Sequence, residues 1–208
     1  MPLMKKLACL ACAGAALTLC QSVQANVLVT LLPRDQPIAV GGVADVYLRI
    51  SGLGATASPP SLGAFDIYVG YDPGILGFVG FTFGDRVLGD QLDLSGGGTI
   101  TIVEDIPGSL NFVHLFELSL DPPDTLIDRQ ASAFMLGRLR FSALAPGWSF
   151  LLLFADLADE NGDRLPADTE GAVVSTPEPG TLWMLVVPSG ALAFTSLGRR
   201  LRIGKQSP

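Results

Sequence analysis

The chain has 208 residues, which is room for one ordinary domain plus terminal signals, since domains usually hold roughly 100 to 200 residues. Residues 26–175 contain seven Arg, no Lys and 19 Asp plus Glu, so this segment carries a net charge of −12. Such a surface repels nucleic acid and anionic lipid, and the charge therefore excludes a nucleic-acid-binding function.

The N-terminal segment has the layout of a secretory signal peptide. Two lysines precede an apolar stretch over residues 7–19, and Val23 and Ala25 place small residues at the −3 and −1 positions of a cleavage site. We predict a signal peptide over residues 1–25 and a mature chain that starts near Asn26. A retained anchor is the alternative, but 13 apolar residues are fewer than the roughly 20 that span a bilayer.

The three cysteines, Cys9, Cys12 and Cys20, all lie in or directly after that apolar stretch. The mature chain would therefore contain no cysteine and no disulfide. Lipidation of Cys20 is an alternative, although Leu19 is bulky at a position where such sites have Gly, Ala or Ser.

Residues 26–175 have the pattern of an all-β domain, with short apolar runs interrupted by Gly, Pro, Asp and Asn. Over residues 45–50 apolar and polar side chains alternate, so a strand there would bury only one face. The same reasoning predicts strands over residues 27–32, 65–71, 76–83, 99–103, 111–120, 134–143 and 149–155. About eight short strands with few helical windows fit a sandwich of two sheets, each shielding the other's apolar face.

Two connections between strands have turn chemistry. Asp72 can accept a hydrogen bond from the backbone ahead of it and Pro73 fixes its own φ, so the strand ending at Tyr71 should leave its sheet. Asn161 and Gly162 form a dipeptide that accepts the positive φ angles of a tight hairpin.

One passage resembles a known family. Residues 61–84, SLGAFDIYVGYDPGILGFVGFTFG, are similar to the strand, turn and strand of cohesin-type domains of carbohydrate systems, where F-x-[ILV]-x-[YF]-[DN]-P-x-[ILV]-L-x-F is common. Residues 37–53, PIAVGGVADVYLRISGL, resemble the start of those domains. The resemblance covers most of residues 27–174 and implies a nine-stranded jelly-roll sandwich. It carries over no dockerin-binding surface, because no specific residues match one.

The single histidine, His114, limits the catalytic chemistry available. A Ser/His/Asp or Cys/His site would need it, yet the mature chain has no cysteine and no G-x-S-x-G elbow. Strand spacing places His114 between Phe112 and Phe116 on an apolar face, which favours a packed or edge histidine. A glycosidase-like pair of carboxylates stays open as an alternative, since such a pair is defined by distance in space. We predict no catalytic residues and a protein that is not an enzyme.

The segment ADENGDRL offers the only candidate metal ligands. Asp159, Asn161 and Asp163 stand at alternate positions, as at the start of an oxygen-rich Ca²⁺ loop. Arg164 and the absence of a glutamate at the twelfth position depart from the EF-hand pattern, so a hairpin turn is favoured. A weak calcium site, shared with Asp156 or Glu160, is the alternative. A histidine-based zinc site is excluded in the monomer, because the other ligands would be carboxylates alone. No other cofactor is expected.

Three aromatic residues are candidate carbohydrate contacts. Tyr47 and Tyr68 are exposed by strand alternation and Trp148 by its place in a loop, and aromatic rings can pack on sugar faces. The alternative for Trp148, which follows Ala-Pro-Gly, is that it covers the end of the sandwich.

The C-terminal segment, residues 176–208, has three parts. The prolines of TPEPG lack an N–H, so this stretch cannot join the middle of a sheet or helix. Residues 181–197 carry no charge, and as a helix they would span about 25 Å, slightly short of a roughly 30 Å hydrocarbon layer. A basic cluster follows, which marks the cytoplasmic side of a transmembrane helix and consists of Arg199, Arg200, Arg202 and Lys205.

These three parts, in this order, resemble the PEP-CTERM sorting signal of Gram-negative bacteria. The motif would be Pro177, Glu178 and Pro179, while Trp183 and Pro188 depart from the usual Leu/Ala-rich span. The resemblance implies cleavage near the motif by an exosortase, a membrane-embedded enzyme, and an association with exopolysaccharide and biofilm.

The sequence therefore predicts a non-catalytic protein that is exported across the inner membrane. It would be held transiently by its C-terminal helix and would then stay at the cell surface or outside the cell. Extracellular polysaccharide or another surface protein would be its partner. The alternatives are a carbohydrate-binding module that uses the exposed aromatics and a hydrolase that uses paired carboxylates.

Overall fold

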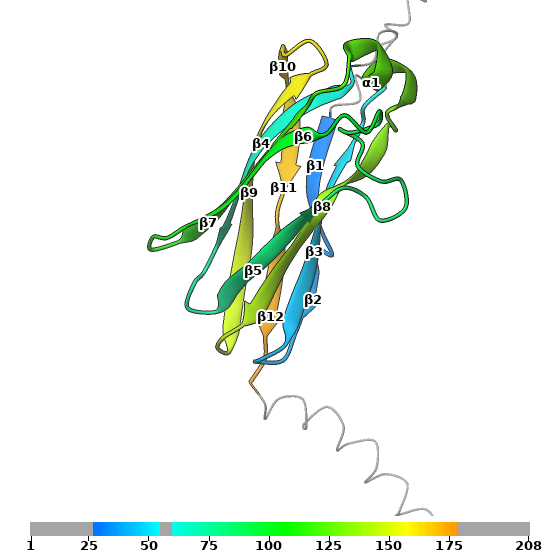
Figure 1. Cartoon of the computed structure of the whole chain (residues 1–208). Helices are drawn as coiled ribbons and strands as arrows, with labels where there is room; N and C mark the ends of the chain where they lie inside the picture. Colours follow the sequence, from blue (N-terminus) through cyan, green and yellow to red (C-terminus); the bar gives the residue numbers. More distant parts are fainter. Residues whose placement is uncertain (1–26, 55–59, 179–208) are drawn as a thin grey trace, which may run out of the picture.

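The computed structural model describes residues 27–54 and 60–178, which form two β-sheets packed face to face (Figure 1). The predicted signal peptide, the span over residues 181–197, Pro179 and the basic cluster all lie outside the described residues. The first sheet has the order β11-β1-β3-β8-β5. The bounds are β11 Ala167–Glu170, β1 Val27–Leu32, β3 Val43–Ser51, β8 Ala133–Ala143 and β5 Leu76–Phe83.

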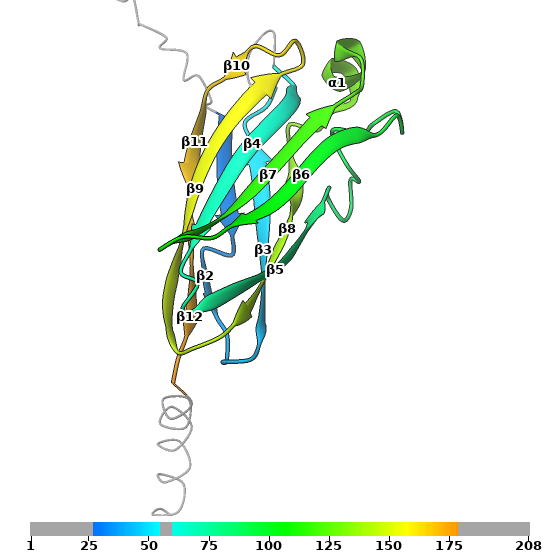
Figure 2. The same cartoon turned by 60° about the vertical axis from the view of Figure 1, so that its left-hand side comes forward.

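The second sheet has seven strands, and Figure 2 shows β9, β4, β7 and β6 side by side. Its order is β2-β12-β9-β4-β7-β6, and β10 pairs with β9. The bounds are β2 Asp35–Pro37, β12 Ala172–Thr176, β9 Gly147–Asp159, β4 Leu62–Tyr71, β7 Asn111–Ser119, β6 Thr99–Ile106 and β10 Arg164–Leu165.

The predicted two-sheet sandwich is confirmed, and all eight predicted strands are present. The described part of the chain has twelve strands, not the nine that the cohesin resemblance implied. The additional strands β2, β10, β11 and β12 hold only two to five residues each. Runs this short show no clear period of two, and they become strands because they pair with longer neighbours: β11 runs parallel to β1, and β12 runs antiparallel to β9.

The core lies between the two sheets and is built by the alternation that the sequence shows. Leu48 and Ile50 of β3 and Ile67 and Val69 of β4 are completely buried from opposite sheets. Burying each such side chain contributes roughly 1.5 to 3 kcal/mol, which makes the shared inner face the main source of stability.

The turn after Tyr71 carries the chain from one sheet to the other, as predicted. The Asp72 carboxylate accepts a hydrogen bond from the Gly74 N–H at 2.8 Å, and its carbonyl accepts one from the Leu76 N–H at 2.9 Å. Strand β4 before the turn belongs to the second sheet, and β5 after it belongs to the first.

The hairpin at Asn161-Gly162 is present, but its loop is longer than the tight turn that the sequence predicted. Residues 160–163 separate the end of β9 from the start of β10, so the loop has four residues. Only Gly162 has a positive φ, of 86°, whereas a two-residue turn of the predicted kind needs positive φ at both positions.

A short helix, α1 (Pro123–Arg129), was not predicted. It begins with a proline in its first turn, has Asp124 in that turn and Arg129 in its last, and buries Leu126. Gln130 then ties it to the sandwich, since its side-chain amide donates to the Leu62 carbonyl and accepts from the Leu62 N–H. Within residues 27–54 and 60–178, no helix has the length and apolarity needed to cross a membrane.

Candidate functional site

The outward face of the second sheet is covered by apolar side chains. Of the sixteen large apolar residues exposed in the described part of the chain, seven point outward from β9 and β6. The most exposed are Trp148 at 71%, Phe150 at 61% and Phe154 at 55%. We call this surface the apolar sheet face; the seven residues are Trp148, Phe150, Leu152, Phe154, Ile100, Ile102 and Ile106.

Strand β9 is apolar on both of its faces, which explains the origin of this surface. Leu151 and Leu153 point into the core and are buried, while Phe150, Leu152 and Phe154 alternate with them and are exposed. A run such as FLLLF is typical of a strand that is covered on both sides. In this chain the second cover is not supplied by any described residue, because the outward half of the run stays exposed.

Strand pairing aligns these residues in rows across the sheet. Leu152, Gly70, Phe112 and Ile106 occupy one row, from β9 through β4 and β7 to β6. Gly70 has no side chain, and beside it lies a shallow hollow of about 380 Å³ lined by Tyr68, Ile106, Phe112 and Phe154. Such a hollow in an apolar surface can receive a protruding side chain.

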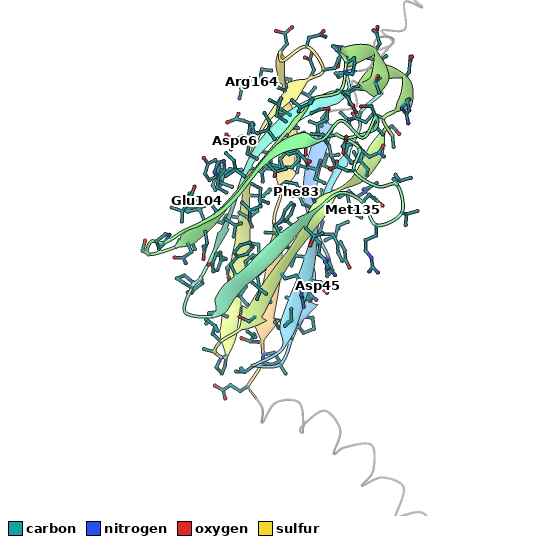
Figure 3. All side chains as sticks on the ribbon, in the orientation of Figure 1. Asp45, Asp66, Phe83, Glu104, Met135 and Arg164 are labelled. Carbon is teal, nitrogen blue, oxygen red and sulfur yellow. The ribbon has the colours of Figure 1, made fainter. Side chains whose placement is uncertain are left out.

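The next two rows contain a polar centre within the apolar sheet face. His114 Nε2 lies 2.9 Å from Asp66 Oδ1, and the His114 ring stacks on Tyr68 with centroids 4.5 Å apart and planes 7° apart. Glu104 on β6 is the cross-strand partner of His114. Figure 3 shows Asp66 and Glu104 on the same side of the sandwich. The prediction that His114 is packed is confirmed, and its neighbours include the carboxylates of Asp66 and Glu104.

The three candidate carbohydrate contacts do not form one site. Tyr68 and Trp148 lie on the apolar sheet face, and one face of the Tyr68 ring is covered by His114. Tyr47 points outward from β3 on the opposite sheet, in register with Arg138. With 71% of Trp148 exposed, this residue does not cover the end of the sandwich.

The candidate calcium ligands have a structural part in the β9–β10 loop. Asp159 Oδ1 accepts hydrogen bonds from the N–H groups of Asn161 and Asp163, both at 2.9 Å. The Asn161 amide donates to Glu160 Oε1 at 3.0 Å. Among the residues that the structure describes, no group of three or more His, Cys, Asp or Glu side chains is arranged to hold a metal ion. A weak calcium site at Asp159, Asn161 and Asp163 stays a prediction.

The first two residues of the predicted sorting motif follow directly on the sandwich. Strand β12 ends at Thr176, one residue beyond the predicted domain end, and the Thr176 hydroxyl donates to the Ala145 carbonyl at 2.6 Å. Pro177 comes next and cannot continue the sheet because it lacks an N–H. Glu178 is exposed, so the motif begins where the sandwich ends.

The sequence matches no protein-family profile and no curated protein. The structure, in contrast, is similar to solved cohesin domains. A type II cohesin from the cellulosome of Acetivibrio cellulolyticus superposes with a TM-score of 0.56 at 13% identity, covering 72% of this chain and 95% of its own. The sixth cohesin of scaffoldin B from the same organism, solved with a mutant Cel5 dockerin, gives 0.54 at 12% identity over 73% and 99%.

A non-cellulosomal cohesin from the archaeon Archaeoglobus fulgidus gives a TM-score of 0.50 at 11% identity, covering 78% of this chain and 99% of its own. The fold is therefore cohesin-like, as the resemblance of residues 61–84 implied.

The apolar sheet face was missed at the level of sequence. The signal was available in residues 149–155, where five consecutive apolar residues, FLLLF, break the period of two that a half-exposed strand should show. The residues of β4, β7 and β6 that lie beside that run could not be read from the sequence, because they are distant from β9 along the chain.

Proposed function

We propose that this chain is an exported docking protein, without catalytic activity, that binds a protein partner through the apolar sheet face. The observation that carries the proposal is the exposure of seven aromatic and branched side chains on β9 and β6, at the two sides of the same sheet face. Contiguous apolar patches on soluble domains mark interaction sites, and buried aromatic anchors supply most of the binding energy in such interfaces.

The charges on this face define the chemistry of the partner. Asp66 and Glu104 place two carboxylates beside His114 in the middle of the apolar surface. Asp66 already contacts His114, but a partner that buries this face must supply a positive group beside Glu104, because an unpaired carboxylate is costly to remove from water. The partner is therefore a protein with an apolar surface and a central Lys or Arg. Cohesins of the same fold have been solved in complexes with dockerins, which supports a protein partner.

Docking can be tested with a pair of matched variants of the full chain. Immobilised wild-type chain is used to capture a partner from the extracellular proteins of the source organism, and binding of the purified partner is then measured. Phe154→Ser should weaken binding at least about thirty-fold, the effect of one hot-spot residue of roughly 2 kcal/mol. Val79→Ser, which alters an exposed apolar residue of the other sheet, is the control and should bind normally.

Two further results would support the same surface. Glu104→Lys should repel the positive group and weaken binding, while hydrogen exchange should show protection on β6, β7 and β9 in the complex. A captured protein that binds Phe154→Ser as tightly as wild type, or that protects the other sheet, contradicts the proposal.

We also propose that the C-terminal segment is a PEP-CTERM sorting signal that an exosortase processes. On this proposal the protein is anchored transiently in the inner membrane and then becomes part of the extracellular polysaccharide matrix. The support is the order of motif, uncharged span and basic cluster in residues 176–205, together with the position of Pro177 and Glu178 directly after the last strand.

Sorting is tested by replacing Pro177, Glu178 and Pro179 with alanine. The wild type should be trimmed at its C-terminus and released, whereas the variant should keep its full length and stay in the membrane fraction. Immunoblots of the membrane and extracellular fractions measure both properties. A variant that is trimmed and exported like the wild type rules out sorting through this motif.

Carbohydrate binding is the second candidate function, and the exposure of Trp148 favours it. A ring that is 71% accessible on an apolar face can pack on a sugar. A glycan array probed with wild type and Trp148→Ala separates the two functions. Glycan binding that disappears in Trp148→Ala supports this candidate, and the absence of glycan binding by the wild type dismisses it.

A further inference from the structure

A second hollow, of about 610 Å³, lies on the outward side of the first sheet, away from the apolar sheet face. Three adjacent strands meet there: Tyr47 on β3, Arg138 on β8 and Thr82 on β5 stand in one row of the sheet. Figure 3 shows Met135, which also lines the hollow, on the opposite side of the sandwich from Asp66 and Glu104. The hollow is therefore a separate surface feature.

An irregularity in β8 lies at this hollow. Pairing with β3 moves from Leu48 opposite Gly137 to Arg49 opposite Met135, so one extra residue of β8 is accommodated there. Gly137 lines the hollow with its backbone, and it pairs with the core residue Leu48, so a side chain here would point into the sandwich. A Cβ at this position would lie 2.2 Å from the Phe81 ring, which requires glycine.

One wall of the hollow is a loop that Asp85 holds in place. Its carboxylate accepts hydrogen bonds from the N–H groups of Val87 at 2.7 Å and Leu88 at 3.1 Å within the loop, and from Met135 of β8 at 3.0 Å. Partial burial would raise the pKa of Asp85, but these three donors lower it below its ordinary value. Asp85 is thus ionised at neutral pH and keeps Arg86 and Val87 at the edge of the hollow.

Positive charge gathers around the hollow although the domain is strongly acidic. Four of the seven arginines of residues 26–175 are on this side of the first sheet: Arg49, Arg86, Arg138 and Arg140. Asp45 faces two of them, with its carboxylate 3.8 Å from Arg138 and 3.3 Å from Arg140. Arg86 forms no ion pair among the described residues, so both guanidinium groups that line the hollow retain free donors.

We propose that this hollow binds a saccharide that bears a carboxylate, with the carboxylate between Arg86 and Arg138 and the sugar ring against Tyr47. Guanidinium groups match the geometry of a carboxylate and donate paired hydrogen bonds to it. The apolar lining of Tyr47, Phe83, Val87 and Met135 gives a ring a surface that a small inorganic anion would not use. The site is independent of the docking surface, because it lies on the other sheet.

Calorimetric titration of the full chain with a galacturonic acid trisaccharide tests the proposal. The wild type should bind the acid form at least about ten-fold more tightly than its methyl ester, which keeps the rings and removes the charge. Arg86→Gln should weaken binding of the acid form by about ten-fold or more, and Tyr47→Leu should weaken it by a similar factor. Both side chains are at the surface, so the variants should fold.

Arg164→Gln is the matched control, because it removes an exposed arginine on β10, which pairs with the second sheet. This variant should bind the acid trisaccharide as the wild type does. The proposal is overturned if the wild type gives no heat at millimolar trisaccharide, if the methyl ester binds equally well, or if Arg86→Gln has no effect. It is also overturned if inorganic phosphate binds as tightly as the trisaccharide, since the hollow would then be a simple anion site.

Discussion

The outward faces of the two sheets differ, although both sheets bury their inner faces in the same core. On the first sheet, β3 and β8 present Asp45, Tyr47 and Arg49 beside Arg138 and Arg140, which is the polar surface expected of a sheet in contact with water. On the second sheet, β9 and β6 present the apolar sheet face. The second sheet thus has apolar side chains on both faces, whereas the first sheet has them mainly on its inner face.

Strand β7 shows this difference most clearly, because an acidic residue follows Val113 and Leu115 on its inward face while two phenylalanines point outward. Phe112 and Phe116 are on the outward face, whereas the acidic Glu117 points into the sandwich and is only 1% exposed. Burial raises the pKa of Glu117 from its ordinary 4.5 to about 8, and the carboxylates of Asp90 and Asp93 add to the shift. The folded protein therefore holds Glu117 protonated at neutral pH.

Glu117 should make the stability of the protein strongly dependent on pH. Between pH 4.5 and about 8 the folded state keeps a proton that the unfolded state has lost, so stability falls as the pH rises through this window. The slope approaches about 1.4 kcal/mol per pH unit. Glu117→Gln should remove this slope and make the protein more stable than wild type at pH 8. Urea unfolding between pH 4.5 and 8.5 measures it.

Glu104→Gln is the control for this experiment, since Glu104 is exposed on β6 and its variant should keep the wild-type slope. If Glu117→Gln and wild type lose stability in parallel as the pH rises, Glu117 is not the group that causes this loss of stability.

The next effect compares the two faces of β9 directly, through two neighbouring leucines. Leu151 is 1% exposed and Leu152 is 44% exposed. Leu151→Ala should cost about 2 to 5 kcal/mol of unfolding free energy because it leaves a cavity in the core. Leu152→Ala should cost less than about 1 kcal/mol. Chemical denaturation measures both, and an equal loss would mean that another part of the chain already covers the apolar sheet face.

The smallest effect concerns the charged face of the first sheet. Asp45 lies near Arg138 and Arg140, but all three side chains are at least 30% exposed, so water screens these ion pairs. Asp45→Asn should change the unfolding free energy by less than about 1 kcal/mol. A larger loss in thermal unfolding would show that this face depends on its ion pairs, which would weaken the contrast between the two sheets.

Much of the fold follows from local patterns in the sequence. Alternation predicted the eight main strands, and the Asp72-Pro73 turn predicted the change of sheet, because both depend on residues that are neighbours in the chain. The four short strands and α1 were not predictable in this way. Strands β11 and β12 exist only because β1 and β9 offer them free edges, and α1 is held by the bonds of Gln130 to Leu62.

The candidate sites were also only partly predictable from the sequence. Sequence patterns alone indicated an acidic all-β domain between two apolar ends, a histidine among apolar residues and the exposure of Trp148, while Tyr47 and Tyr68 are half-buried in the structure. Strand pairing in the folded protein puts Trp148 on the same face as Tyr68 and places Tyr47 beside Arg138 on the other sheet. A period of two tells whether a side chain points toward the core or toward the outward face of its sheet. Which outward side chains become neighbours is set by pairing between strands that are far apart in the chain.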